Sequence, residues 1–169
     1  MEWMLLPLRR YAEFSGRSRR MEYWMFILFQ FIVNIALYAL LFAIGGAGIM
    51  LAAGGNANVG AATMGGGMII IFALIAIVGF GLIIPSLAVG VRRLHDTNRS
   101  GWWIMAPLAG SVLMVVGAVV QSGALAAVGS LVTVILAIVL LVFFFLDGTV
   151  GVNRYGPDPK GRADASVFA

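Results

Sequence analysis

The stretch RRLHDTNR, residues 92–99, decides the fold, because it is a short charged segment between two long uncharged ones. No residue in 23–91 or in 100–146 carries a charge. All other charged residues lie near the two ends of the chain, within 1–22 and 147–169. A bilayer core about 30 Å thick takes roughly 20 helical residues per crossing. The spacing therefore predicts an all-α integral membrane protein in which charged segments alternate with membrane crossings.

Composition supports the same conclusion. Of the 169 residues, 62% are apolar and only 11% are charged, against about 25% charged in a typical soluble domain. A soluble fold needs charged residues to cover its surface, and this chain has too few of them. Lipid is the solvent that accepts the apolar surface that is left. The chain has no cysteine, which excludes disulfides, thiolate catalysis and thiolate metal sites.

The uncharged spans divide into four crossings. The span 102–146 has 45 residues, which at about 1.5 Å per residue is too long for one crossing and right for two. The segment 45–67 is uncharged but rich in Gly, Ala and Asn, which favours a loop. The predicted organisation of this single membrane domain, 1–169, is a cytoplasmic N-terminal segment 1–22, transmembrane helices 23–44, 68–91, 102–120 and 124–146, a periplasmic loop 45–67, a cytoplasmic loop 92–101, a periplasmic turn 121–123 and a cytoplasmic tail 147–169.

The distribution of basic residues predicts the orientation. Four crossings place all 11 Lys and Arg residues on one side of the membrane, and basic residues in short loops stay in the cytoplasm. We therefore expect a multi-pass protein of the bacterial inner membrane with both termini cytoplasmic. Aromatic residues flank the charged segments, as in an interfacial belt: Trp3, Tyr23, Trp24, Trp102 and Trp103. The charged and aromatic segments together form a predicted cytoplasmic cap.

Three motifs in the cap resemble a known family. They are YAEFSGRSRRMEYW at 11–24, RRLHDTNRSGWW at 92–103 and DGTVGVNRYGPDP at 147–159. In this order, separated by apolar spans, they resemble the bacterial inner-membrane family called domain of unknown function 805. The likeness extends over nearly the whole chain, and the loop 45–67 is the part least covered. The resemblance implies a small multi-spanning membrane protein, and the family name assigns no activity.

The acidic residues of the cap predict ion pairs that fix the packing of the helices. Glu22 begins the first predicted crossing, Asp147 follows the fourth, and Arg92 and Arg93 end the second. These groups lie at similar depth, near an interface where the dielectric constant is reduced and pairing is stronger than on a wet surface. We hypothesise structural ion pairs for Glu22, Asp96 and Asp147.

The surplus of arginine suggests a second role for the cap. Arginine forks match phosphate oxygens in bidentate fashion, and basic pockets on the cytoplasmic side hold anionic headgroups. The hypothetical site for an anionic lipid headgroup or a phosphorylated ligand comprises Arg17, Arg19, Arg20, Arg92, Arg93, Arg99, Arg154, Trp102 and Trp103.

The sequence offers little for catalysis. His95 and Asp96 are the one pair that suggests chemistry, but neighbouring residues rarely point at each other, and a catalytic His needs a positioned partner. Asp96-Thr97-Asn98 is also typical of a turn. One His, no Cys and few carboxylates make a metal site improbable. We predict no enzyme activity, no catalytic residue, no metal, no cofactor and no nucleic-acid partner, and an enzyme that uses His95 and Asp96 is the weaker alternative.

Polar and small residues also recur inside the predicted crossings. Gln30, Asn34 and Tyr38 share one helical face, which indicates hydrogen bonds between helices or, as the alternative, the lining of a polar path. Gly129, Thr133 and Ala137 form a small-residue stripe on the fourth predicted crossing, suited to tight packing. The absence of Asp, Glu or His from the membrane argues against an ion-coupled transporter.

Taken together, these patterns predict a four-helix membrane bundle. The expected role is a non-enzymatic component that binds an anionic headgroup, a phosphorylated ligand or a partner protein through the cap, and a small passive transporter or channel is the alternative. The expected partners are the lipid bilayer, with an anionic lipid, a membrane protein or a second copy of the chain beside it. The stiff segment 155–159 should strap back over the helix ends, with Arg154 and Tyr155 packed between them.

Overall fold

The computed structural model describes residues 2–162, so residues 163–169 of the predicted tail lie outside the described part. The elements are α1 (Glu2–Arg9), α2 (Arg20–Ala53), α3 (Ala57–Asp96), the 3-10 helix η1 (Gly101–Met105), α4 (Ala106–Val119) and α5 (Gly123–Phe145). Four helical segments are long and apolar enough to cross a membrane, namely α2, α3, η1 with α4, and α5. The prediction of an all-α protein with four crossings is therefore confirmed.

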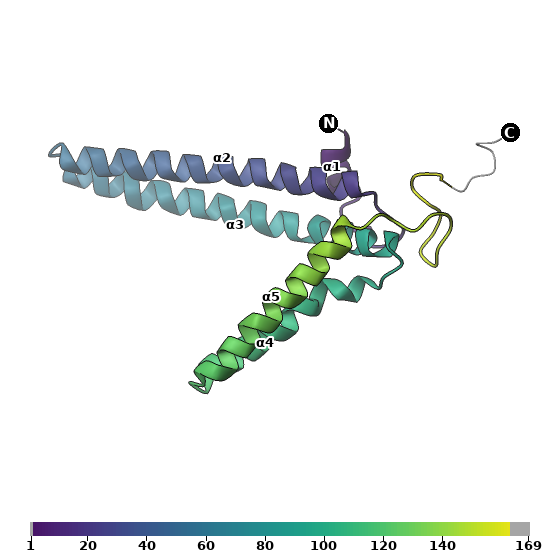
Figure 1. The fold of residues 1–169 in the computed structure, drawn as a ribbon. Helices are drawn as coiled ribbons and strands as arrows, with labels where there is room; N and C mark the ends of the chain where they lie inside the picture. Colours follow the sequence, from purple (N-terminus) through teal and green to yellow (C-terminus); the bar gives the residue numbers. More distant parts are fainter. Residues whose placement is uncertain (1, 163–169) are drawn as a thin grey trace.

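The four helices form two hairpins that diverge from one end (Figure 1). Helix α2 packs along α3, and α4 packs along α5, whereas the two hairpins contact each other mainly where α3 meets η1 and α5. At Gly90 a Cβ atom would lie 2.7 Å from Ile104, which shows how closely α3 approaches η1 there. Further along α3, a Cβ atom at Gly79 or Gly81 would meet nothing within 4 Å. The expected bundle is wrong: the hairpins are joined at the cap and splay apart beyond it.

The predicted loop 45–67 is also wrong. Helix α2 continues to Ala53 and α3 begins at Ala57. The small residues in this segment let two backbones touch, because a Cβ atom at Gly60 would lie 2.6 Å from the Ala52 nitrogen. At 1.5 Å per residue, α2 and α3 are about 51 and 60 Å long. The α2–α3 hairpin is therefore much longer than α5, whose 23 residues span about 35 Å.

The α4–α5 hairpin is held by close backbone contact. A Cβ atom at Gly129 would lie 2.6 Å from Cα of Met114, and one at Gly110 would lie 2.5 Å from Oγ1 of Thr133. The predicted packing is confirmed for Gly129 and Thr133, whereas Ala137, the third residue of the predicted stripe, is exposed. The turn between α4 and α5 uses Gln121 in a left-handed conformation, with φ of 55°.

The N-terminal segment is anchored at a proline in α3. Pro85 has no N–H, so the carbonyl of Gly81, four residues earlier, lacks its helical donor. The hydroxyl of Tyr11 donates to that carbonyl oxygen at 2.7 Å. A side chain from outside the helix thus satisfies the backbone group that the proline leaves unpaired.

Replacing Tyr11 with Phe should destabilise the protein by about 1 kcal/mol, because the Gly81 carbonyl then loses its donor. Pro85→Ala restores the N–H that Gly81 would bond in a regular helix. In that background the Tyr11→Phe change should cost close to nothing. Thermal unfolding of the two single variants and the double variant in detergent measures this coupling. An equal cost of Tyr11→Phe in both backgrounds would show that the hydroxyl does not serve the proline gap.

Candidate functional site

Asp96, the last residue of α3, lies at the centre of the cap. Its Oδ1 accepts a hydrogen bond from Nε of Arg17 at 2.9 Å, and its Oδ2 accepts one from Nη1 of Arg93 at 2.5 Å. The Asp96 side chain is 3% exposed and both guanidinium groups are enclosed. Gly148 packs against this carboxylate so closely that a Cβ atom there would overlap it. One buried acid therefore joins two buried arginines from different segments.

Arg17 ties the C-terminal tail to this centre. Its Nη1 donates to the Gly151 carbonyl at 2.7 Å, and its Nη2 donates to the Thr149 carbonyl at 2.5 Å. The Thr149 N–H in turn donates to the Asp96 carbonyl at 2.9 Å. The segment before α2, the end of α3 and the tail are thus bound into one unit.

Arg93 joins the two hairpins. Its Nε donates to the Phe144 carbonyl at 3.3 Å, and its Nη2 donates to the Leu146 carbonyl. These carbonyls lie at the C-terminal end of α5, where helix geometry leaves oxygens without a helical donor. A side chain of α3 therefore caps α5 of the other hairpin.

Glu22 and Arg92 form a second enclosed pair. Nη2 of Arg92 donates to Oε1 of Glu22 at 2.9 Å, with side-chain exposures of 0% and 3%. Nη1 of Arg92 also donates to the Glu13 carbonyl. This pair connects α2, α3 and the N-terminal segment.

Asp147 occupies a different environment from the other two acids. Its side chain is 50% exposed and lies 2.6 Å from Nζ of Lys160 and 3.4 Å from Nη2 of Arg20. The hydrogen bond from Lys160 lowers the pKa of the Asp147 carboxyl below its ordinary value. Such solvent-exposed pairs contribute little to stability.

The structure separates the seven arginines of the predicted anion site into two groups. Arg17, Arg92 and Arg93 are buried and donate to protein oxygens, so a ligand would have to displace those partners. Four arginines are partly or fully accessible: Arg19, Arg20, Arg99 and Arg154. Arg19 donates to the Pro159 carbonyl. The two tryptophans of the predicted site are exposed as well, Trp102 to 81% and Trp103 to 40%.

Arg99 and Arg154 share an arrangement that differs from the buried group. The Arg99 guanidinium lies 4.0 Å from the centroid of the Phe143 ring, and that of Arg154 lies 4.7 Å from the centroid of Tyr155. Within residues 2–162, each guanidinium donates to one carbonyl. Arg99 donates to the Thr97 carbonyl at 3.3 Å, and Arg154 donates to the Asn98 carbonyl at 3.1 Å. Aromatic rings thus position both guanidinium groups at the surface.

His95 and Asp96 do not form a catalytic pair in this geometry. The Asp96 carboxylate is occupied by two arginines. The His95 ring instead stacks on Tyr155, with centroids 3.8 Å apart and planes at 4°, and its Nδ1 lies 3.2 Å from the Gly16 carbonyl oxygen. The Asn153 side chain donates to the His95 carbonyl at 3.0 Å. The predicted strapping of the tail over the end of α3 is therefore confirmed for Tyr155, whereas Arg154, which was predicted to pack between the helix ends, is exposed.

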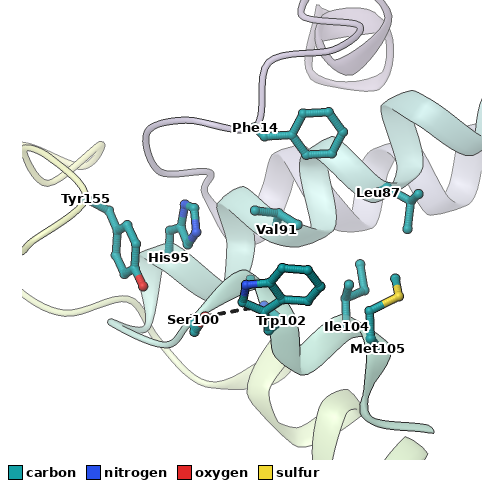
Figure 2. A pocket seen from close by; sticks show the side chains of 10 residues that line it. Phe14, Leu87, Val91, His95, Ser100, Trp102, Ile104, Met105 and Tyr155 are labelled. Carbon is teal, nitrogen blue, oxygen red and sulfur yellow. Dashed lines mark hydrogen bonds between the residues drawn. The ribbon is translucent and has the colours of Figure 1, made fainter. Parts of the chain in front are cut away.

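A pocket of about 460 Å³ lies between α3 and η1, and we call it the cap pocket. Figure 2 shows His95 and Tyr155 toward one end and Leu87 and Met105 toward the other. Sequence reasoning missed most of the residues that line it. Leu87 and Met105 carry no signal in a chain that is mostly apolar, and Tyr155 was predicted only as a packing residue.

Of the three polar residues predicted to share one face of the first crossing, Gln30 and Asn34 make hydrogen bonds within the first hairpin, whereas Tyr38 is 48% exposed. Nε2 of Gln30 donates to Oγ of Ser86 at 3.0 Å, which confirms a hydrogen bond between helices, and Nδ2 of Asn34 donates to the Gln30 carbonyl at 2.8 Å. These residues line a groove of about 260 Å³ between α2 and α3. Passive transport along this groove stays a prediction. Within residues 2–162, no three His, Asp or Glu side chains group closely enough to hold a metal ion.

The tail contains a carboxylate with a depressed pKa. Burial raises the pKa of Asp158, but the hydrogen bonds that it accepts from Nε of Arg162 at 2.8 Å and from the Lys160 N–H at 2.9 Å outweigh burial and bring it to about 2. An unfolded Asp has a pKa of about 3.9. The stabilisation from ionised Asp158 is therefore complete above pH about 4 and is lost as the pH falls toward 2.

A comparison of the wild type with Asp158→Asn from above pH 4 down to pH 2 isolates the stabilisation that ionised Asp158 provides. Above pH 4 the wild type should unfold at a higher temperature than the variant, because the ionised carboxylate of Asp158 forms an ion pair with Arg162 and the amide of the variant cannot. The difference should shrink between pH 4 and pH 2 as Asp158 takes up a proton. Thermal unfolding of both proteins at intervals of pH measures it. A constant difference over the whole range would exclude this carboxylate as an anchor of the tail.

The chain is similar to bacterial membrane proteins. A family model described as Protein of unknown function (DUF805) matches residues 11–157, which include α2 to α5. The inner membrane protein YhaI of Escherichia coli (strain K12) is 36% identical over 163 residues, covering 95% of this chain and 97% of the relative. The inner membrane protein YhaH of the same strain is 34% identical over 160 residues, covering 95% and 98%. No solved structure matches the chain significantly.

Proposed function

We propose the following function for this chain, which belongs to the family described as Protein of unknown function (DUF805). It is a non-enzymatic component of the bacterial inner membrane, and its cap binds an anionic, phosphate-bearing group. The cap faces the cytoplasm in this proposal. Its buried arginines hold the two hairpins together, and its accessible arginines bind the ligand.

The arrangement of Arg99 and Arg154 is the observation that supports the proposal. Each guanidinium lies on an aromatic ring at the surface and, among the described residues, donates to one carbonyl oxygen. The remaining N–H groups of a guanidinium fork suit the bidentate geometry of phosphate. Stacking on a ring restricts the side chain in advance, so less conformational entropy is lost on binding.

The charge distribution supports the cytoplasmic placement of the cap. Every Lys and Arg residue belongs to the cap end of the molecule, and the formal net charge is +4. Basic residues beside membrane crossings favour the cytoplasmic side. The anionic lipids of that leaflet attract basic segments by about 1 kcal/mol per residue near the surface.

Lys160, the chain's sole lysine, allows a direct test of sidedness. Its side chain is 30% exposed, so a membrane-impermeant amine reagent can reach it from the cap side. We expect mass mapping to find Lys160 modified only after the inner membrane has been opened. Modification in cells with an intact inner membrane would place the cap on the opposite side.

Native mass spectrometry of the delipidated protein tests the binding. Titration with phosphatidylglycerol should give several-fold more lipid-bound protein than titration with phosphatidylcholine of the same chains. Arg99→Gln/Arg154→Gln should remove this preference, whereas Arg9→Gln, an exposed arginine on α1, should leave it intact. Arg92 and Arg93 are unsuitable targets, because their replacement would break the buried network. Equal retention of both lipids by the wild type would refute the proposal.

A further inference from the structure

We infer that the phosphate-bearing ligand is a membrane glycerophospholipid, with part of an acyl chain in the cap pocket and its phosphate at Arg154. This inference rests on the proposed function and names the source of the phosphate. The cap pocket has a volume of about 460 Å³, within the range of about 300–1,000 Å³ typical of small-molecule sites.

The two ends of the pocket differ in polarity, as the two ends of a lipid do. One end carries ring and hydroxyl groups, which come from His95, Ser100 and Tyr155. The other end carries the apolar side chains of Leu87, Ile104 and Met105 (Figure 2). His95 and Leu87 are eight residues apart in α3, which corresponds to about 12 Å along the helix axis. The pocket therefore runs from the level of the charged cap into the apolar part of the hairpin.

The position of the pocket explains why a lipid fits better than a soluble phosphate. Its walls come from α3 of one hairpin and from η1 at the start of the other, so it lies where the hairpins begin to diverge. Beyond it, the hairpins diverge (Figure 1), and both carry apolar side chains that are exposed in the structure, such as Ile77 of α3 and Val112 of α4. Within a bilayer, the space between the hairpins has to be filled by hydrocarbon. A soluble phosphate would leave the apolar end of the pocket without a ligand.

The Arg154 guanidinium lies next to a residue of the polar end, Tyr155, although it does not itself line the pocket. The Tyr155 ring stacks on His95, which lines the pocket, and the same ring carries the Arg154 guanidinium 4.7 Å from its centroid. The Arg154 Nη2 donates to the Asn98 carbonyl at 3.1 Å, which fixes its direction. Trp102, exposed to 81%, lines the same pocket and suits the headgroup region of a membrane.

The test compares phosphatidylglycerol with glycerol phosphate, which has the phosphate but no chains. Bound to the delipidated wild-type protein, phosphatidylglycerol should resist displacement by glycerol phosphate. Leu87→Trp should fill the apolar end and weaken phosphatidylglycerol binding about tenfold, the cost of excluding about two methylene groups. Leu108→Trp, at an exposed position of α4 outside the pocket, is the matched control and should bind as the wild type does.

The outcomes separate this inference from the proposed function. If glycerol phosphate displaces the lipid readily, or if a folded Leu87→Trp variant binds like the wild type, the pocket holds no chain although the cap still binds phosphate. If the wild type does not prefer phosphatidylglycerol to phosphatidylcholine, both proposals fail. The displacement experiment uses the wild type alone, so it decides the question even if Leu87→Trp does not fold.

Discussion

Asp96→Asn is expected to destabilise the protein by about 3–5 kcal/mol, the usual cost of leaving buried charges without their partner. The substitution keeps the size of the side chain and removes its charge. Arg17 and Arg93 would then lie within a few ångströms of each other without the carboxylate that now accepts from both. Because these arginines also bind the tail and α5, we expect the tail and the second hairpin to loosen together.

Asp147→Asn is the matched control for this change. Both residues are cap aspartates paired with basic side chains, but Asp147 is half exposed and Asp96 is enclosed. The control should cost less than about 1 kcal/mol, as exposed ion pairs do. Thermal unfolding in mild detergent compares the two variants. Similar losses of stability would mean that burial of the Asp96 network is not what holds the cap.

Gly129→Ala should destabilise the α4–α5 hairpin by about 1–3 kcal/mol or more, the range for overpacking. Its Cβ atom would overlap the backbone of Met114, which cannot rotate away as a side chain could. The two helices would have to separate along their length. In lipid, close packing is a main source of helix association, so the lost contacts are not replaced by a hydrophobic gain.

Gly79→Ala is the control for this prediction. Gly79 also lies within a membrane helix, but a Cβ atom there meets nothing within 4 Å. Alanine has the higher helix propensity, so the control should be neutral or slightly stabilising. Unfolding of both variants in the same detergent gives the comparison. A Gly129→Ala protein as stable as the wild type would show that the backbones of α4 and α5 are not in close contact at Met114.

The crossings could be predicted because charge is the strongest signal in a membrane sequence. An ionised group is costly in the hydrocarbon core, so the uncharged spans on either side of Arg92 and Arg99 indicate where the chain enters lipid. Charge also predicts the end of the fourth crossing at Leu146, one residue beyond the end of α5 at Phe145. It says nothing about how hairpins pack against each other, and the splayed arrangement was missed for that reason.

The segment 45–67 shows the limit of composition. Gly, Ala and Asn favour turns in water, yet in lipid the same small residues let helices approach closely. Gly48 and Gly60 serve this second purpose where α2 and α3 cross. The sequence alone does not distinguish these two uses of glycine, so the long α2–α3 hairpin was predicted as two short helices with a loop.

The site was only partly predictable, because arginine has two uses in the cap. Sequence spacing brought all seven arginines to one face but could not separate the enclosed Arg17, Arg92 and Arg93 from the exposed Arg154. The difference depends on which carbonyl oxygens of the tail and of α5 lie within reach, and that follows from the tertiary fold.

The distance between the two hairpins, measured by spin labels, tests the central claim most directly. The chain has no cysteine, so Ile77→Cys with Leu131→Cys gives one labelled pair. Ile77 lies thirteen residues from Gly90 in α3, and Leu131 lies thirteen residues from Phe144 in α5, so both are equally far from the point where the hairpins meet. In lipid nanodiscs we expect a separation well beyond the ~10 Å between packed helix axes. A separation near that spacing would mean a closed four-helix bundle and would contradict hairpins held together only at the cap.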